Sequence, residues 1–163
     1  MNDKYKDVIS FKDFLNNIPL HTYDIENIKD SNTCIECISG IIAKELKDCN
    51  VNERPLHCIM DKDENTETLM KNKEWIKEHV KEYDYNTPML DENVLGYVIK
   101  VDKEIQNMDI DEEFKTNIKK IMKRIITKPD YIKEINGTLF YEIHINKYEL
   151  NHELLESEKT VIL

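Results

Sequence analysis

Five residues in the first half of the chain are of types that bind zinc. A C-x-x-C pair is followed by a third cysteine and a His-Cys pair: Cys34, Cys37, Cys49, His57 and Cys58. Four thiolate or imidazole ligands in tetrahedral geometry form a structural zinc site. The C-x-x-C pair, however, lies within TCIECISGIIAKEL, whose apolar spacing is typical of an amphipathic helix and not of a zinc knuckle. We therefore favour cysteines that fill the core, and we expect no metal and no other cofactor.

The segment DKDENTETLMKN begins like the calcium-binding loop of an EF-hand. Asp61, Asp63 and Asn65 occupy loop positions one, three and five. Thr66 then replaces the glycine that makes the sharp turn, and Asn72 replaces the bidentate glutamate. A solvated turn is the better interpretation because these two features of the loop are missing.

His57 and Cys58 have the composition of a catalytic dyad but not its geometry. Adjacent residues of a strand point to opposite faces, so the imidazole cannot easily activate the thiol. The three glycines of the chain are too few for a glycine-rich phosphate loop, and none of the common hydrolase motifs is present. We expect a protein that is not an enzyme and has no catalytic residues.

A basic stripe runs along the predicted helix 110–128. Its members are Lys115, Lys119, Lys120, Lys123, Arg124 and Lys128. A basic helix followed by a hairpin, here at about 131–146, is the order of elements in a winged-helix nucleic-acid-binding protein. The net charge of −10 disfavours binding to phosphate backbones, and a solvated helix face explains the same residues. Nucleic-acid binding is therefore our alternative interpretation.

The strongest apolar periodicity predicts a helical hairpin at about 90–127, with an earlier helix at about 33–48. The hairpin positions are Leu90, Val94, Val98, Val101, Ile105 and Met108, then Ile110, Phe114, Ile118, Ile121 and Ile125. Asp109 or Asp111 is the expected cap of its second helix, and Pro129 ends that helix. For the earlier helix, the expected cap is Ser31, Asn32 or Thr33.

Two β-hairpins complete the expected fold. PLHCIM and ETLMK flank a polar turn and predict a hairpin at about 55–71, and Asn136-Gly137 between β-rich runs predicts another at about 131–146. NKEWIKEHVKEY, residues 72–83, predicts a helix anchored by Trp75. VISFKDFLNNI, residues 8–18, predicts a short helix ended by Pro19, and the polar C-terminal segment from residue 147 predicts a further helix.

Length and composition are typical of one globular domain. A chain of 163 residues with 40% hydrophobic residues predicts a single domain over 1–163, with 1–22 as a peripheral N-terminal segment. The fold class we expect is α+β and mostly helical. No apolar run approaches the ~20 residues that span a bilayer, and the N-terminus is unlike a signal peptide. We expect an intracellular protein that is not secreted and does not contact membranes.

The segment ERPLHCIMDKDENTETLMKNKEWIKE, with the amphipathic helix before it, resembles part of a known family. It is similar to the C-terminal domain of uncharacterised proteins of nucleocytoplasmic large DNA viruses, many of which carry an N-terminal zinc finger and a coiled coil. The matching positions are Arg54, Pro55, Leu56, His57, Cys58, Leu69, Lys71, Trp75 and Lys77. The chain departs from that family in having no finger or coiled coil before this segment, and in the acidic turn after Cys58. The resemblance implies a viral origin, and a location in the host cytoplasm, the viral factory or the virion.

We therefore expect a non-enzymatic large-DNA-virus protein that acts through protein-protein contacts, as a component of the virion or the viral factory. Its partner would be another protein or a second copy of itself. The alternative is a winged-helix-like protein that binds nucleic acid through the helix 110–128 and the hairpin 131–146.

Overall fold

A computed structural model describes residues 8–60, 66–81 and 84–146. The helices of this part are α2 (Phe11–Asn16), α3 (Thr22–Ile25), α4 (Ser31–Asp48), the 3₁₀ turn η1 (Val51–Glu53), α5 (Pro88–Gln106), α6 (Glu112–Thr127) and α7 (Pro129–Ile143). The strands are β1 (Leu56–Met60), β2 (Thr66–Lys71), β3 (Trp75–Lys81), β4 (Asp84–Asn86) and β5 (His144–Asn146). The expected mostly helical α+β fold is confirmed.

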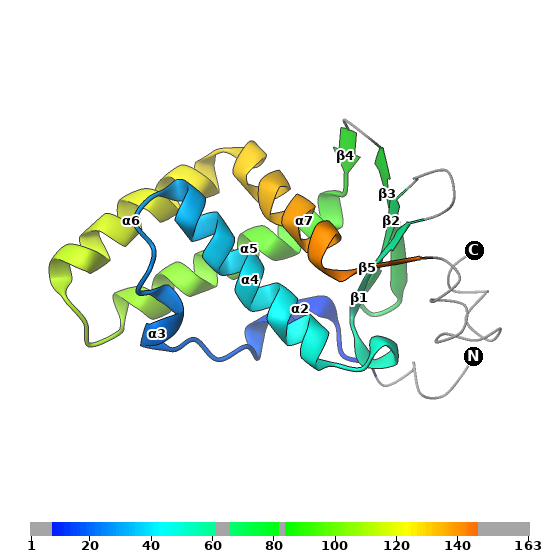
Figure 1. Ribbon diagram of the computed structural model, residues 1–163, viewed down its shortest axis with the longest axis horizontal. Helices are drawn as coiled ribbons and strands as arrows, with labels where there is room; N and C mark the ends of the chain where they lie inside the picture. The colour runs from blue at the N-terminus through cyan, green and yellow to red at the C-terminus, as the bar shows by residue number, and fades with distance from the viewer. Residues whose placement is uncertain (1–7, 61–65, 82–83, 147–163) are drawn as a thin grey trace.

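The described strands form one sheet in the order β4-β3-β2-β1-β5. The first four are antiparallel neighbours, and β5 joins the edge of β1 in parallel. Figure 1 shows the helices gathered on one side of this sheet. Leu56, Cys58 and Met70 face the helices and belong to the main core, whereas Ile59 and Leu69 pack with Trp75 on the opposite face.

The main core is built from the apolar faces of α4, α5, α6 and α7. The helical hairpin expected at 90–127 is confirmed as α5 and α6. The helix expected at 33–48 is α4, but its cap is Asp30 and not one of the three residues proposed from the sequence. The Asp30 carboxylate accepts a hydrogen bond from the Thr33 N–H at 2.8 Å, which satisfies a free amide of the first turn.

The hairpin expected at 131–146 is wrong, because residues 129–143 form the helix α7. Pro129 occupies its first turn, where the fixed φ of proline suits a helix. Its buried residues recur at helical spacing and pack on the rest of the core: Ile132, Ile135, Asn136, Leu139, Phe140 and Ile143. This burial outweighs the turn preference of Asn136-Gly137, which is a purely local signal.

The helix expected at 72–83 is also wrong, because residues 75–81 form the strand β3. Trp75 and Lys77 point to the outer face of the sheet, and Glu78 points toward α5. The Lys77 ammonium pairs with the Glu67 carboxylate of β2 at 3.3 Å. Because β3 pairs with β2 on one side and β4 on the other, its backbone hydrogen bonds are formed within the sheet. A helix in this segment would form no more of them.

Several expectations lie outside the described residues. These are the acidic turn 61–65 and the C-terminal helix from residue 147. Among the described helices, none has both the length and the apolar character needed to cross a bilayer.

Candidate functional site

The zinc candidates are not brought together. Across residues 8–60, 66–81 and 84–146, no three His, Cys, Asp or Glu side chains form a group that could hold a metal ion. The Cys37 thiol donates to the Asp24 carbonyl at 2.9 Å, and the Cys49 thiol to the Glu45 carbonyl at 3.4 Å. Cys34 is buried with its sulfur 3.9 Å from that of Met122.

Burial also keeps the buried cysteines in the thiol form. It raises the pKa of Cys34 to about 12 and that of Cys37 to about 11, and it raises the pKa of Cys58 further still. The thiolate, and not the thiol, is the nucleophile and the metal ligand. Cys34 and Cys58 therefore act as core residues, and Cys37 packs against the core. For Cys34 and Cys37 the amphipathic helix pattern indicated this.

His57 and Cys58 lie on opposite faces of the sheet. Cys58 points into the helical core, and His57 stacks on Trp75 with ring centroids 5.5 Å apart. His57 is only 2% exposed, and burial, helped by the positive charge of Arg54, lowers the pKa of the imidazole to about 3. The ring is thus neutral at physiological pH and cannot activate the Cys58 thiol.

The residues that carry the family resemblance divide between the two faces of the sheet. Pro55, Leu56 and Cys58 are buried, with Leu56 and Cys58 in the helical core. His57 and Trp75 form an aromatic pair on the outer face, with the Lys71 ammonium 5.8 Å from the Trp75 ring. Arg54 Nε, His57 Nε2 and Trp75 Nε1 have no hydrogen-bond partner among the described residues. These contacts pack the outer face of the sheet.

A pair of neighbouring carboxylates between β3 and α5 was not anticipated from the sequence. Both Glu78 and Asp91 have a pKa raised mainly by burial, and the negative charge of Asp91 contributes to the shift of Glu78. Glu78 is 7% exposed and accepts hydrogen bonds from the Met89 N–H at 2.7 Å and the Leu90 N–H at 3.3 Å. The Glu78 carboxylate thereby caps the N-terminus of α5.

Asp91 links the same region to α7. Its carboxylate accepts hydrogen bonds from Thr87 and from the buried amide of Asn136, and it lies 3.8 Å from the Lys133 ammonium. Because these carboxylates hold β3, α5 and α7 together, their arrangement is structural. No sequence signal identified the pair, since residues 72–83 were expected to form a helix.

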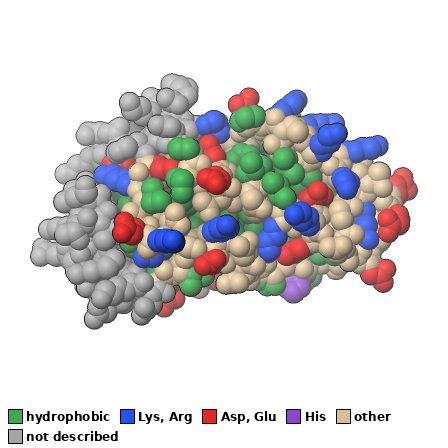
Figure 2. All heavy atoms as spheres, turned by 180° about the vertical axis from the view of Figure 1, so that it is seen from behind, with side chains coloured by type: hydrophobic (Ala, Val, Ile, Leu, Met, Phe, Trp, Pro, Cys, Tyr) green, Lys and Arg blue, Asp and Glu red, His purple; other side chains and the backbone are tan. Residues whose placement is uncertain are grey.

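The basic stripe lies on the exposed face of α6. Lys119, Lys120, Lys123, Arg124 and Lys128 are exposed, and Lys115 is partly buried and pairs with Glu112 at 3.4 Å. The four basic residues Lys119, Lys120, Lys123 and Arg124 form no ion pair with a described residue. Figure 2 shows Lys and Arg side chains concentrated toward the end of the molecule away from the grey residues. The expected wing is absent because α7 follows α6 directly.

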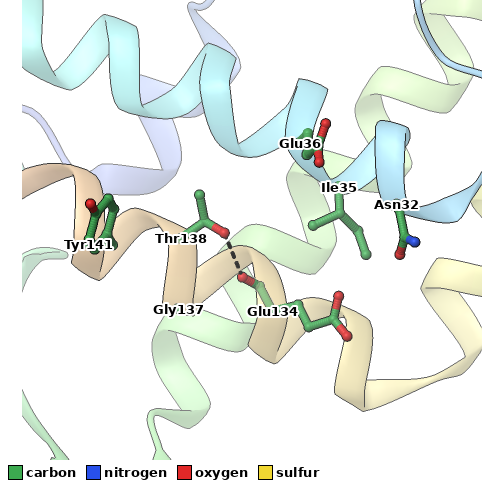
Figure 3. Close-up of a pocket in the computed structure, with 7 residues that line it drawn as sticks. All are labelled: Asn32, Ile35, Glu36, Glu134, Gly137, Thr138 and Tyr141. Carbon is green, nitrogen blue, oxygen red and sulfur yellow. Dashed lines mark hydrogen bonds between the residues drawn. The ribbon is translucent and has the colours of Figure 1, made fainter.

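A surface groove runs between α4 and α7, and Figure 3 shows its wider end. A hollow of about 540 Å³ is lined by Asn32, Ile35, Glu36, Glu134, Gly137, Thr138 and Tyr141. A second hollow of about 500 Å³ is lined by Glu36, Gly40, Ala43, Lys44, Lys47, Asp48, Thr138 and Glu142. The two share Glu36 and Thr138, so they form one continuous depression, which we call the α4-α7 groove.

In comparisons with known proteins, no family model, no curated protein and no solved structure matches this chain.

Proposed function

We propose that this chain is a non-enzymatic protein that acts through contacts with other proteins, and that the exposed face of α6 binds an acidic partner surface. The observation that carries the proposal is the segregation of charge. Residues 114–128 hold six basic and no acidic residues, in a chain whose net charge is −10. Subtracting these six from the total leaves −16 on the remaining residues, so α6 is a positive surface on a negative molecule.

The lack of acidic neighbours around these cations supports a binding role. A solvated surface helix usually mixes both signs along its exposed face, and neighbouring pairs then neutralise each other. On α6, the acidic residues Glu112 and Glu113 are confined to the first turn. Lys119, Lys120, Lys123 and Arg124 keep their charges available to a partner, and like charges this close repel one another until a partner arrives.

The placement of the reactive side chains supports a non-enzymatic role. The buried thiols are protonated, His57 is neutral and turned away from Cys58, and Glu78 is engaged at a helix N-terminus. The resemblance of residues 54–77 extends the proposal to a role in the virion or the viral factory of a large DNA virus.

Nucleic-acid binding is the second candidate, and the spacing of the cations favours it. Lys119 and Lys123 form one row, and Lys120 and Arg124 a second, each with a rise of about 6 Å between its members. Such rows neutralise phosphates. The described residues place no wing or other base-reading element beside α6, so we expect such binding to be independent of sequence.

Fluorescence anisotropy distinguishes the two candidates. The probes are a labelled poly-Glu peptide of about 20 residues and a random DNA duplex of about 20 base pairs, each at about 50 mM and about 300 mM NaCl. We expect saturable binding of the peptide that weakens at the higher salt. The double variant Lys119→Glu/Lys123→Glu should lose at least about tenfold in affinity, which corresponds to the loss of about 1.4 kcal/mol.

The matched control is Lys12→Glu/Lys73→Glu, because it changes the net charge equally at exposed positions on α2 and in the turn between β2 and β3, away from α6 (Figure 1). If this control loses as much affinity as the α6 variant, binding reflects total charge and the proposal fails. Binding of the duplex at least about tenfold tighter than the peptide would replace the first candidate with the second. If neither probe binds at low salt, both candidates are excluded.

A further inference from the structure

The α4-α7 groove has a shape that accepts a helix. It follows α4 from Asn32 to Asp48, a length of about 24 Å at 1.5 Å per residue. Its floor carries small side chains, including Gly40, Ala43 and Thr138. A Cβ atom added at Gly40 would meet no atom within 4 Å, so the centre of the groove is open.

The two ends of the groove differ in charge. At the wider end, Glu36 and Glu134 are exposed and form no ion pair with a described residue (Figure 3). At the other end, Lys44 pairs with Asp48 at 3.7 Å and Lys47 pairs with Glu142. The groove therefore offers free negative charge at the wider end and paired charges, with two lysines, at the other.

The helix α6 carries the complementary pattern at the same spacing. Its first turn holds Glu112 and Glu113, and the cations that pair with no residue in the described part of the chain begin at Lys119. Glu112 and Lys120 are eight residues apart, as are Glu36 and Lys44, and each separation is about 12 Å along a helix. An α6 helix laid antiparallel to α4 thus sets its acidic turn beside Lys44 and its cations beside Glu36 and Glu134. The length of α6, sixteen residues or about 24 Å, equals that of the groove.

We propose that α6 of a second copy of this chain docks in the α4-α7 groove, antiparallel to α4. This rests on the proposed function and names the acidic partner surface of α6 as the groove of another copy. Tyr141, which is 77% exposed and lines the groove, supplies an aromatic contact for the docked helix.

The contact joins two different surfaces of the chain, so it is heterologous. After one contact forms, one copy still has an unoccupied groove and the other an unoccupied α6. Further copies can therefore add, unless two copies dock reciprocally or a closed ring forms. Since charge supplies much of the contact and exposed ion pairs are weak and screened, the association is weak and falls with salt.

Sedimentation equilibrium from about 10 µM to about 1 mM at about 50 mM NaCl tests the proposal. The wild-type mean mass rises with concentration, and the rise disappears at about 500 mM NaCl. The variants Lys119→Glu/Lys123→Glu and Glu36→Lys/Glu134→Lys are each monomeric alone, because each sets like charges in the groove. Mixed in equal amounts, they associate, because the negative α6 of the first variant then meets the positive groove of the second. Tyr141→Ala weakens wild-type association about tenfold.

Two further variants separate the groove from general effects of charge. Gly40→Gln fills the groove and abolishes association, whereas Gly96→Gln, at an equally open and exposed glycine of α5, leaves it unchanged. A Gly40→Gln protein that associates like the wild type overturns the proposal, as does a mixture of the two charge variants that stays monomeric.

The failure of this inference is distinguishable from that of the proposed function. If the wild type is monomeric at every concentration but its α6 face still binds poly-Glu, the groove is not the partner and the function stands. If Lys119→Glu/Lys123→Glu changes neither association nor peptide binding, both are overturned.

Discussion

At the scale of single residues, burial decides the chemistry of the reactive side chains. His57 and the cysteines have the composition of a metal or catalytic site, but each is placed where its charged form is disfavoured. The amphipathic pattern indicated that Cys34 fills the core, and strand alternation indicated that His57 and Cys58 face opposite sides of the sheet. What the sequence could not reveal was the partner of each side chain, such as Trp75 for His57, because that contact needs the register of β1, β2 and β3.

The buried imidazole makes stability depend on pH. The pKa of His57 is about 3 in the folded protein against an ordinary value of 6.5, so between these values the unfolded chain binds the extra proton. The free energy of unfolding is therefore not reduced by His57 above pH 6.5, and it decreases as the pH falls from 6.5 toward 3. The loss is about 1.4 kcal/mol per pH unit.

Urea denaturation at pH 7 and pH 5 measures this dependence against His57→Phe, which keeps a ring beside Trp75 but cannot titrate. On acidification we expect the wild type to lose about 2 kcal/mol more than the variant. Glu78 and Asp91, whose raised pKa values act in the opposite direction, are common to both proteins and cancel in the comparison. Equal losses in the two proteins would show that His57 is not held neutral.

At the scale of elements, long-range periodicity was a better guide than short motifs. The eleven apolar positions of the helical hairpin predicted α5 and α6, and flanking apolar runs predicted β1 and β2. Asn136-Gly137 predicted a hairpin that is in fact the middle of α7. A two-residue turn signal describes only local preference, whereas the burial of Asn136 and its bond to Asp91 depend on α5, which is distant in sequence.

Substitution of Gly137 by alanine tests the helical state of this segment. In a helix, alanine is favoured over glycine by about 1 kcal/mol, and Gly137 lines the open groove. A two-residue Asn-Gly hairpin turn instead needs positive φ at Gly137, where alanine is strained. We expect Gly137→Ala to raise the free energy of unfolding, as Gly96→Ala should in the exposed part of α5. A gain for Gly96→Ala with a loss for Gly137→Ala would contradict the helix.

At the scale of the whole molecule, charge is unevenly distributed. The overall balance of −10 argued against an anionic partner, but that average conceals the positive face of α6. The stripe itself was readable from the sequence, since helical spacing places its members on one face. The sequence could not show that α7 takes the place of the wing. Nor could it show that α4 and α7 form a groove in which Glu36 and Glu134 pair with no described residue.

The central claim, that the exposed face of α6 is the binding surface, is tested most directly by NMR. Backbone amide shifts of the labelled protein are followed while the poly-Glu peptide is added at about 50 mM NaCl. We predict that the largest shifts fall on residues 115–128 and disappear in Lys119→Glu/Lys123→Glu. Shifts concentrated on the sheet or on the α4-α7 groove, with residues 115–128 unaffected, would contradict it.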